Sequence, residues 1–363
     1  MANQSNYTLQ RNGLFFQVTR VKLDLNMEKE KLISIAQGLI TQGKGILAAD
    51  ESTGTIKKRF DKIGLESNPE NNQRYRDLLF TTPGIEEFIS GAILFDETIR
   101  QTSSDGIPFA KLLQDRGISP GIKVDKGAID LANFPGEKIT EGLDGLRERL
   151  IEYAGLGAKF TKWRAVITIG DGLPSNTCIS SNAESLARFA ALSQEAGLVP
   201  IVEPEVLMDG GHDIKKCEEV TYKTLKTVFI KLAEHKIFLE GMFLKPNMVI
   251  SGKESQAKAD PSQVAQSTLR CFKEVIPKEV PGVVFLSGGQ TPGEATENLD
   301  AVNKLRGVDY KLSFSFGRAL QEPVLEVWRG EDVNIKVAQD AFYKRARLNS
   351  LAVKGIYSKE EEK

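Results

Sequence analysis

The chain has 363 residues, a length that fits either two domains or one large α/β barrel. Its 40% hydrophobic and 27% charged residues and its net charge of −1 indicate an ordinary soluble protein and exclude a global attraction to nucleic acid or anionic membranes. Three widely spaced cysteines outside any CxxC pattern predict neither a disulfide framework nor a zinc knuckle. No segment is apolar for long enough to form a signal-peptide core or to insert into a membrane, so we predict a cytoplasmic protein.

Short runs rich in Val, Ile, Leu and Phe alternate along the chain with longer segments whose apolar residues recur at helical spacing. We predict strands at 45–49, 89–95, 120–124, 160–167, 199–202, 241–244, 283–286 and 310–316. We predict helices at 27–42, 139–156, 181–197, 213–236, 261–275, 293–305 and 331–351.

Strands that alternate with crossover helices form a parallel sheet, and eight such units without a break in composition favour one closed barrel over two domains. The predicted fold is therefore a single (β/α)8 TIM barrel over residues 27–350, with an extra N-terminal helix. Residues 1–26 form a flexible extension in this prediction, and residues 351–363 form a C-terminal tail. A doubly wound open sheet is the alternative fold.

Polar residues stand at the carboxyl ends of the predicted strands, where barrel enzymes gather their catalytic groups. These ends carry Asp50 and Glu51, Asp96 and Glu97, Lys123 and Asp125, Lys162 and Arg164, Glu203 and Glu205, Lys245, Ser287 to Gly289, and Gly317 and Arg318. A charged residue often does no more than begin a loop. That explanation is weaker for Lys123, Lys162, Glu203 and Glu205, which lie within or beside apolar runs.

Lys245 lies inside the apolar run 239–250, where an unpartnered ammonium would be costly. Desolvation and a nearby cation such as Lys162 lower the pKa of a lysine, which leaves its amine free to attack a carbonyl and form a Schiff base. The alternative is a structural lysine paired with a carboxylate.

Imine chemistry also needs groups that deliver and remove protons. Glu203 and Glu205 stand at alternate positions and therefore on one face of their strand, where repulsion between them can raise the pKa of one carboxyl. The alternative is that both pair with lysines. Asp50, directly after the first strand, is a candidate base or a partner that orients a lysine.

The ends of the last two strands, Ser287 to Gln290 and Phe316 to Arg318, resemble a phosphate site because glycines expose backbone N–H groups and arginine grips phosphate. Lys123 and Arg164 lie on the opposite side of the predicted barrel and are candidates for a second phosphate. Two anion sites around Lys245 predict a substrate phosphorylated at both ends. His212 and His235 lie far apart, so we predict no metal site.

Over residues 27–350 the sequence resembles the class I fructose-1,6-bisphosphate aldolases of the eukaryotic glycolytic type. Seven segments carry the resemblance, in the family's order: GKGILAADESTG at 43–54, PGIKVDKG at 120–127, KWR at 162–164, VPIVEPE at 199–205, LKPNM at 244–248, FLSGGQ at 285–290 and FGRALQ at 316–321. The resemblance implies a metal-independent lyase with no cofactor, which cleaves fructose 1,6-bisphosphate to dihydroxyacetone phosphate and glyceraldehyde 3-phosphate.

The resemblance also implies a role for each matching residue. Lys245 would form the Schiff base, Glu203 would shuttle protons, Asp50 would deprotonate the C4 hydroxyl, and Glu205 and Lys162 would assist. The implied C1-phosphate residues are Ser287, Gly288, Gly289, Ser315, Gly317 and Arg318, and those for the C6 phosphate are Ser52, Thr55, Lys123 and Arg164. A homotetramer is implied as well, and some family members bind actin or the cytoplasmic tails of adhesion proteins.

Two parts of the chain depart from the family pattern. Many members end in a tyrosine that reaches the active site, whereas here Tyr357 is the nearest candidate and a charged segment, 360–363, follows it. We expect this charged tail to stay solvated. Residues 1–26 carry no family motif. A Schiff-base aldolase or transaldolase with another sugar phosphate and a binding scaffold without catalysis are the alternative functions.

Overall fold

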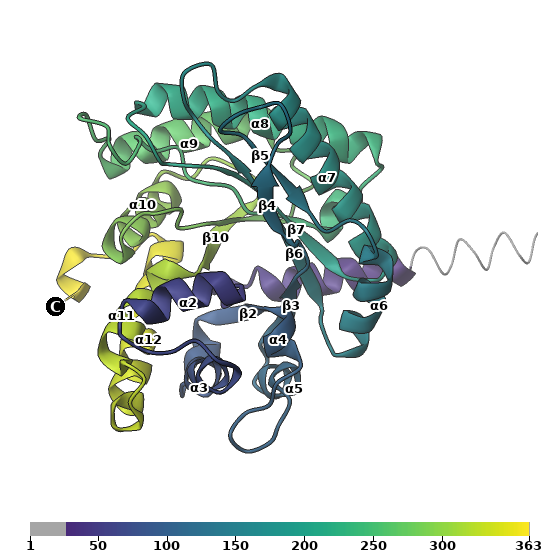
Figure 1. Ribbon diagram of the computed structural model, residues 1–363. Coiled ribbons are helices and arrows are strands. Elements are labelled where there is room, and N and C mark those ends of the chain that lie inside the picture. Colours follow the sequence, from purple (N-terminus) through teal and green to yellow (C-terminus); the bar gives the residue numbers. More distant parts are fainter. Residues whose placement is uncertain (1–26, 363) are drawn as a thin grey trace, which may run out of the picture.

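The computed structural model describes residues 27–362 and shows a closed barrel of parallel strands surrounded by helices (Figure 1). The barrel strands, in spatial order, are β1 (Gly45–Ala48), β2 (Ile89–Leu94), β3 (Ser119–Lys123), β6 (Phe160–Ile167), β7 (Val199–Val206), β8 (Phe243–Leu244), β9 (Gly282–Phe285) and β10 (Lys311–Phe316). Because β1 pairs with both β2 and β10, the sheet has no free edge. The predicted barrel is confirmed, and the open sheet is excluded. The predicted extension, 1–26, lies outside the described residues.

The helices that cover the barrel are α2 (Thr53–Asp61), α3 (Pro69–Phe80), α4 (Asp96–Ile99), α5 (Phe109–Asp115), α6 (Leu146–Gly155), α7 (Asn176–Glu195), α8 (Ile214–Glu234), α9 (Pro261–Val275), α10 (Pro292–Leu305), α11 (Arg318–Trp328) and α12 (Ile335–Lys354). Capping boxes begin α9, from Asp260, and α10, from Thr291, and each has proline in its first turn. Those signals explain why both starts were predictable. No helix of the described residues is long and apolar enough to cross a membrane.

The segment before α6 differs from the sequence prediction. We expected a helix from residue 139, but α6 begins at Leu146, and residues 138–141 form β5 (Lys138–Glu141) in an antiparallel hairpin with β4 (Gly127–Asp130). Gly142 and Gly145 have φ angles of 127° and 65°, which separate the strand from the helix. Helices α2, α3, α4, α5 and α11 were not predicted.

Inside the barrel, side chains alternate between the interior and the helices. In β7, Val199 and Ile201 belong to the interior cluster, Val202 packs toward the helices, and Glu203 and Glu205 fall on the interior side at the far end of the strand. The other strands follow the same period. Apolar outward residues such as Val202 and Val206 therefore stand beside the inward Glu203 and Glu205, and this is why charged residues appear inside apolar runs of sequence.

The amino-terminal end of the barrel interior is filled by apolar side chains and closed by the predicted extra helix, seen here in residues 27–39. Leu32, Ala36 and Leu39 pack on Phe160 and the other inward residues of the first barrel layer. Gly121 faces Phe160 so closely that an added Cβ would overlap the phenylalanine ring. Side chains therefore fill the barrel interior at this end.

The C-terminal tail lies against the outer helices through ion pairs, while Glu360 and Glu361 themselves remain exposed, as the expected solvated tail would have them. The predicted boundary at residue 350 falls within α12, and the last described residues form a single 3-10 turn, η4 (Lys359–Glu362), beside α10. Glu362 contacts Arg345 Nη1 at 2.7 Å through each carboxylate oxygen, and Lys359 pairs with Glu297 of α10 at 3.0 Å. Cations on the outer helices hold the acidic end of the tail.

Candidate active site

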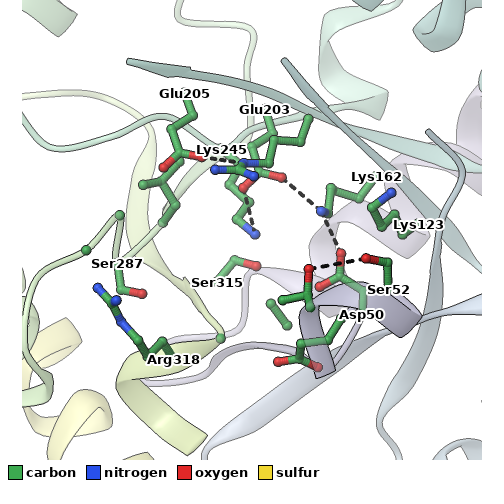
Figure 2. A pocket seen from close by; sticks show the side chains of 18 of the residues that line it. Asp50, Ser52, Lys123, Lys162, Glu203, Glu205, Lys245, Ser287, Ser315 and Arg318 are labelled. Carbon is green, nitrogen blue, oxygen red and sulfur yellow. Dashed lines mark hydrogen bonds and ion pairs between the residues drawn. The ribbon is translucent and has the colours of Figure 1, made fainter. Parts of the chain in front are cut away.

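A cavity of about 420 Å³ opens at the carboxyl ends of the barrel strands (Figure 2). It brings together nearly all the predicted site residues, namely Asp50, Ser52, Thr55, Lys123, Lys162, Arg164, Glu203, Glu205, Lys245, Ser287, Gly288, Gly289, Ser315, Gly317 and Arg318. These residues come from strand ends and following loops that are far apart in sequence. Closing the barrel is therefore what assembles the site.

Lys245 follows β8 and continues its pairing with β7, since its backbone N–H donates to the Val202 carbonyl at 2.8 Å. The residue is two positions beyond the inward-facing Phe243 and so points into the barrel. Its side chain is only 4% exposed, and Nζ lies 3.1 Å from Glu203 Oε1. The lysine is thus both buried and held beside a carboxylate that can exchange a proton with it.

Lys162 of β6 connects Asp50 with Glu203. Its Nζ lies 2.5 Å from Asp50 Oδ2 and 3.2 Å from Glu203 Oε2, and the second contact is an ion pair without hydrogen-bond geometry. Together with Lys245 these groups form a buried row in which carboxylates and ammonium groups alternate. Each charge has an opposite neighbour, which compensates part of its desolvation.

The two carboxyl groups of this row remain ionised. Burial raises the pKa of Asp50, but Lys162, Lys245 and Lys123 outweigh burial and hold that pKa below its ordinary value. Burial likewise raises the pKa of Glu203, and Lys162, Lys245 and Arg164 outweigh it. We expected repulsion between neighbouring carboxylates to raise one pKa. For Glu203 the surrounding cations reverse that expectation, so it begins as a proton acceptor.

Glu205 and Lys123 pair with other partners at the rim of the cavity. Glu205 Oε2 binds Arg164 Nε, and Lys123 Nζ binds a carboxylate oxygen of Asp125 and, at 2.8 Å, its carbonyl oxygen. These contacts fix Lys123 and Arg164 at the rim, where both line the cavity. Both residues also line a second cavity of about 720 Å³ that adjoins the first.

The loops after β9 and β10 have the features of an anion site. Gly288 and Gly289 have φ angles of 49° and 93°, and Gly317 precedes α11 without a side-chain cap, which leaves backbone N–H groups of that helix terminus open. Arg318 is the first residue of α11, and a Cβ on Gly289 would lie 3.4 Å from Arg318 Nη2. The buried Ser315 Oγ lacks a partner among the described residues and lines the same cavity.

A second group of polar residues lies on the other side of Lys245. Figure 2 shows Ser287 and Arg318 on one side of the lysine and Ser52 and Lys123 on the other. Ser52 precedes α2, and its Oγ lies 3.2 Å from Thr55 Oγ1. The helix terminus, the hydroxyls and the neighbouring Lys123 form another surface that favours an anion.

Three cations that line the cavity were missed by the sequence prediction: Lys58 and Arg59 of α2, and Lys62 at the C-cap of that helix. Helix α2 has only two buried apolar residues, Ile56 and Phe60, so its helical period is weak. The spacing of the basic residues could have indicated their place in the cavity, because positions 58 and 62, four residues apart, lie on one face of a helix.

Tyr357 is the predicted residue that the structure does not bring to the cavity. Its backbone N–H donates to Asp300 Oδ1 at 2.9 Å, and its hydroxyl donates to Glu362 Oε1 at 3.0 Å. Burial and the Glu362 carboxylate raise the pKa of the phenol above its ordinary value. Tyr357 therefore anchors the tail against α10 in this conformation.

Within residues 27–362, no group of three or more His, Cys, Asp or Glu side chains is arranged to hold a metal ion. The acidic residues of the cavity are paired with lysine and arginine instead. The arrangement supplies one buried amine, two ionised carboxylates beside a shared ammonium group, and an anion surface on each side. Such a set suits acid–base and imine chemistry on a substrate with two anionic ends.

Comparisons with known proteins agree with this chemistry. A family model described as fructose-bisphosphate aldolase class-I matches residues 31–363. The chain is 55% identical over 330 residues to a probable fructose-bisphosphate aldolase class 1 of Xanthomonas campestris, covering 91% of this chain and 99% of that relative. It is 52% identical over 329 residues to fructose-bisphosphate aldolase 6, cytosolic, of Arabidopsis thaliana, covering 90% and 92%.

Among solved structures, fructose-bisphosphate aldolase from Plasmodium falciparum, in complex with TRAP and a small-molecule inhibitor, matches with a TM-score of 0.90 and 50% identity. The match covers 91% of this chain and 96% of that one. This chain belongs to the class I fructose-bisphosphate aldolase family.

Proposed function

We propose that the protein reversibly cleaves fructose 1,6-bisphosphate to dihydroxyacetone phosphate and glyceraldehyde 3-phosphate through an imine between Lys245 and the substrate C2 carbonyl. The observation that carries this assignment is the position of Lys245 Nζ, buried 3.1 Å from Glu203 and between two anion surfaces. The family is metal-independent and uses a Schiff base. A substrate with a single phosphate would leave one of the two anion surfaces unused.

Imine formation begins with transfer of a proton from Lys245 Nζ to Glu203, which the ionised state of Glu203 permits. The free amine attacks C2, and the carbinolamine loses water when Glu203 returns the proton to the leaving hydroxyl. Lys162 lies against the other oxygen of Glu203 and stabilises its negative charge between these transfers. Glu205 holds Arg164 in place beside the reacting centre.

Cleavage of the carbon–carbon bond follows when Asp50 takes the proton of the C4 hydroxyl. The C3–C4 electron pair moves into the protonated imine and forms an enamine, and glyceraldehyde 3-phosphate leaves. The enamine takes up a proton at C3, which balances the proton that Asp50 removed, and one water molecule hydrolyses the imine, which releases dihydroxyacetone phosphate and restores Lys245. The protonated imine accepts the electron pair of the broken bond and the enamine holds it until C3 is protonated, so the proposed reaction uses no cofactor or metal ion.

The two phosphates occupy opposite ends of the cavity in this proposal. The C1 phosphate binds at Ser287, Gly288, Gly289, Ser315, Gly317 and Arg318, where the start of α11 contributes its N–H groups. The C6 phosphate binds at Ser52, Thr55, Lys123 and Arg164. This arrangement places C2 near Lys245 and the C4 hydroxyl on the side of Asp50.

Borohydride trapping tests the proposal directly. The protein is incubated with fructose 1,6-bisphosphate and EDTA, reduced with borohydride, and digested for mass spectrometry. We expect a stable adduct on Lys245 despite the chelator. A folded sample that turns over the substrate but carries no adduct there would contradict the imine mechanism, and a folded sample that neither turns over nor binds the substrate would favour a scaffold.

We also propose a cytoplasmic location, which the cytosolic Arabidopsis thaliana relatives support. A homotetramer is proposed from the family resemblance, and light scattering of the purified chain tests it. A second role in binding an adhesion-protein tail or actin is proposed from the family resemblance, and the Plasmodium falciparum aldolase, solved in complex with TRAP, supports a protein partner. Pull-down with each purified partner, with and without saturating fructose 1,6-bisphosphate, tests that role.

A further inference from the structure

Glu51, the residue after Asp50, is a buried carboxylate that the proposed reaction does not use. Its Oε1 lies 2.5 Å from Arg59 Nη1, and its Oε2 lies 2.6 Å from Arg76 Nη2. Gln321 Nε2 donates to Oε1 at 2.9 Å. One carboxylate thus joins α2, α3 and α11, the helix that begins with Arg318.

Arg59 is the member of this cluster that reaches the active-site cavity. A Cβ added to Gly317 would lie 3.7 Å from Arg59 Nη2, which places this guanidinium beside the backbone at the start of α11. The Arg318 guanidinium lies beside Gly289, across the same anion surface. Arg59 therefore flanks the proposed C1-phosphate site from the side of α2.

The charges of the cluster do not cancel. Glu51 supplies one negative charge to two guanidinium groups, which leaves a surplus of one positive charge. The Arg76 side chain is 3% exposed and does not line the cavity, whereas the Arg59 side chain is 20% exposed and does. The surplus charge is therefore presented to the cavity through Arg59.

We propose that Glu51 is a positioning residue that holds the Arg59 guanidinium against Gly317, so that the C1 phosphate meets two arginines. This inference rests on the proposed function. Arginine is a long side chain with many rotamers, and fixing it before the ligand arrives removes an entropic cost from binding. Gln321 holds Glu51 in place, because its Nε2 donates both to Glu51 and to the carbonyl of Ala48, just before Asp50.

A double-mutant cycle tests the coupling between the two residues. The variants are Glu51→Gln, Arg59→Ala and the pair, and the probe is hexitol 1,6-bisphosphate, which has both phosphates but no carbonyl. We expect each single variant to weaken binding about tenfold by calorimetry, as expected for a lost charge-assisted contact. The double variant should bind about as weakly as Arg59→Ala alone. The KM for fructose 1-phosphate should rise by a similar factor, with kcat changed less than about twofold.

Lys57→Ala is the matched control. This substitution removes the same charge from the same helix as Arg59→Ala. Lys57, however, pairs with Asp61 on the exposed face of α2 and does not line the cavity. We expect its affinity for the probe to remain that of the unmodified protein. Because Glu51→Gln leaves Arg76 buried without its partner, Glu51→Asp provides a second test that retains the charge but withdraws the carboxylate. It should retain the fold by circular dichroism and still weaken probe binding.

Two outcomes would overturn the inference. One is an affinity for hexitol bisphosphate that does not change in folded Glu51→Gln or Glu51→Asp. The other is a Glu51→Gln effect that persists in full in the Arg59→Ala background, which would mean that Glu51 does not act through Arg59. Both presuppose that the unmodified protein binds the probe. An unmodified protein that neither binds it nor cleaves fructose 1,6-bisphosphate would instead refute the proposed function.

Discussion

The two ends of the barrel interior are built from the same strands but have opposite chemistry. At the amino-terminal end, Phe160 and its apolar neighbours are packed under the helix of residues 27–39. At the carboxyl-terminal end, the inward positions two residues further along carry Lys162, Lys245 and Glu203 in a row of compensated charges. Along each of these strands, two residues separate the apolar core from the charged cavity.

This difference shows how a buried lysine is made tolerable. The apolar layer beneath Lys245 keeps water out and supports the side chain, while the carboxylate beside it supplies the opposite charge. The outward residues between the inward charges pack on the helices and keep the strands in place. We therefore expect substitutions at the lower end to change stability and substitutions at the upper end to change activity.

The largest effect should follow from Lys245→Met, which removes the amine but keeps a side chain of similar length. We expect kcat to fall at least about a thousandfold, since loss of a covalent nucleophile is among the most damaging single changes in an enzyme. Borohydride should then trap no adduct. Measured kcat near that of the unmodified protein would remove Lys245 from the mechanism, whatever the stability of the variant.

Leu39→Ala should change stability instead of chemistry. Leu39 is fully buried in the helix that closes the lower end, and truncating such a side chain costs about 2–5 kcal/mol of unfolding free energy. Urea unfolding measures that loss, and kcat of the folded variant at 25 °C should remain within about twofold of the unmodified protein. A large loss of kcat at full occupancy of the folded state would show that the two ends are not independent.

Arg318→Ala should weaken binding of the C1 phosphate. Losing a charge-assisted contact costs about 1.5–3 kcal/mol, or roughly ten- to a hundredfold in kcat/KM for fructose 1,6-bisphosphate. The effect should appear mainly in KM. An unchanged KM would contradict the assignment of the last two strand ends to a phosphate.

The buried charges should make stability depend on pH in the acidic range. The pKa values of Asp50 and Glu203 in the folded protein lie below the ordinary values of 3.8 and 4.5, so both groups stabilise the fold above those values and lose that contribution as the pH falls below them. Urea unfolding between pH 6 and about pH 3 measures the slope. Leu39→Ala should keep this slope and Glu203→Gln should reduce it. Equal slopes in the two variants would assign the acid sensitivity to other groups.

The smallest effect should come from Tyr357→Phe. The change removes one hydrogen bond, from the phenol to Glu362, and should cost about 1 kcal/mol of stability in the tail region. Hydrogen exchange of residues 355–362 measures this loosening. With Tyr357 held on α10, we expect kcat to remain unchanged, and a strong fall in kcat would show that the tail visits the cavity during turnover.

Much of the barrel could be predicted because each strand is an apolar run and a polar or charged residue marks where that run ends. The run that contains Phe243 and Leu244 is apolar on both sides of the strand, and Lys245 interrupts it where the interior becomes polar. Capping residues such as Asp260 and Thr291 predicted where α9 and α10 begin. Most site residues followed from the same strand ends, since closing a parallel barrel brings those ends together, whereas Ser52, Thr55 and Ser315 followed only from the family resemblance.

Other features depend on contacts that no local pattern contains. Helix α2 has little apolar surface and is held instead by Arg59 and its neighbours, so its part in the cavity was missed. The segment that forms β5 was predicted as helix because it closely precedes the true helix α6, from which only the short stretch from Gly142 to Gly145 separates it. The tail looked free because its acidic residues meet Arg345 and other cations only in the folded chain.

The helix that closes the lower end also bears on the order in which the chain is synthesised. Leu32 and Leu39 leave the ribosome early, but their partners in the interior cluster extend to Val284 in β9. The early helix must therefore wait, with its apolar face uncovered, until most of the strands have followed. Such distant contacts slow folding and lengthen the exposure of apolar surface, so the nascent chain should need protection from aggregation for most of its translation.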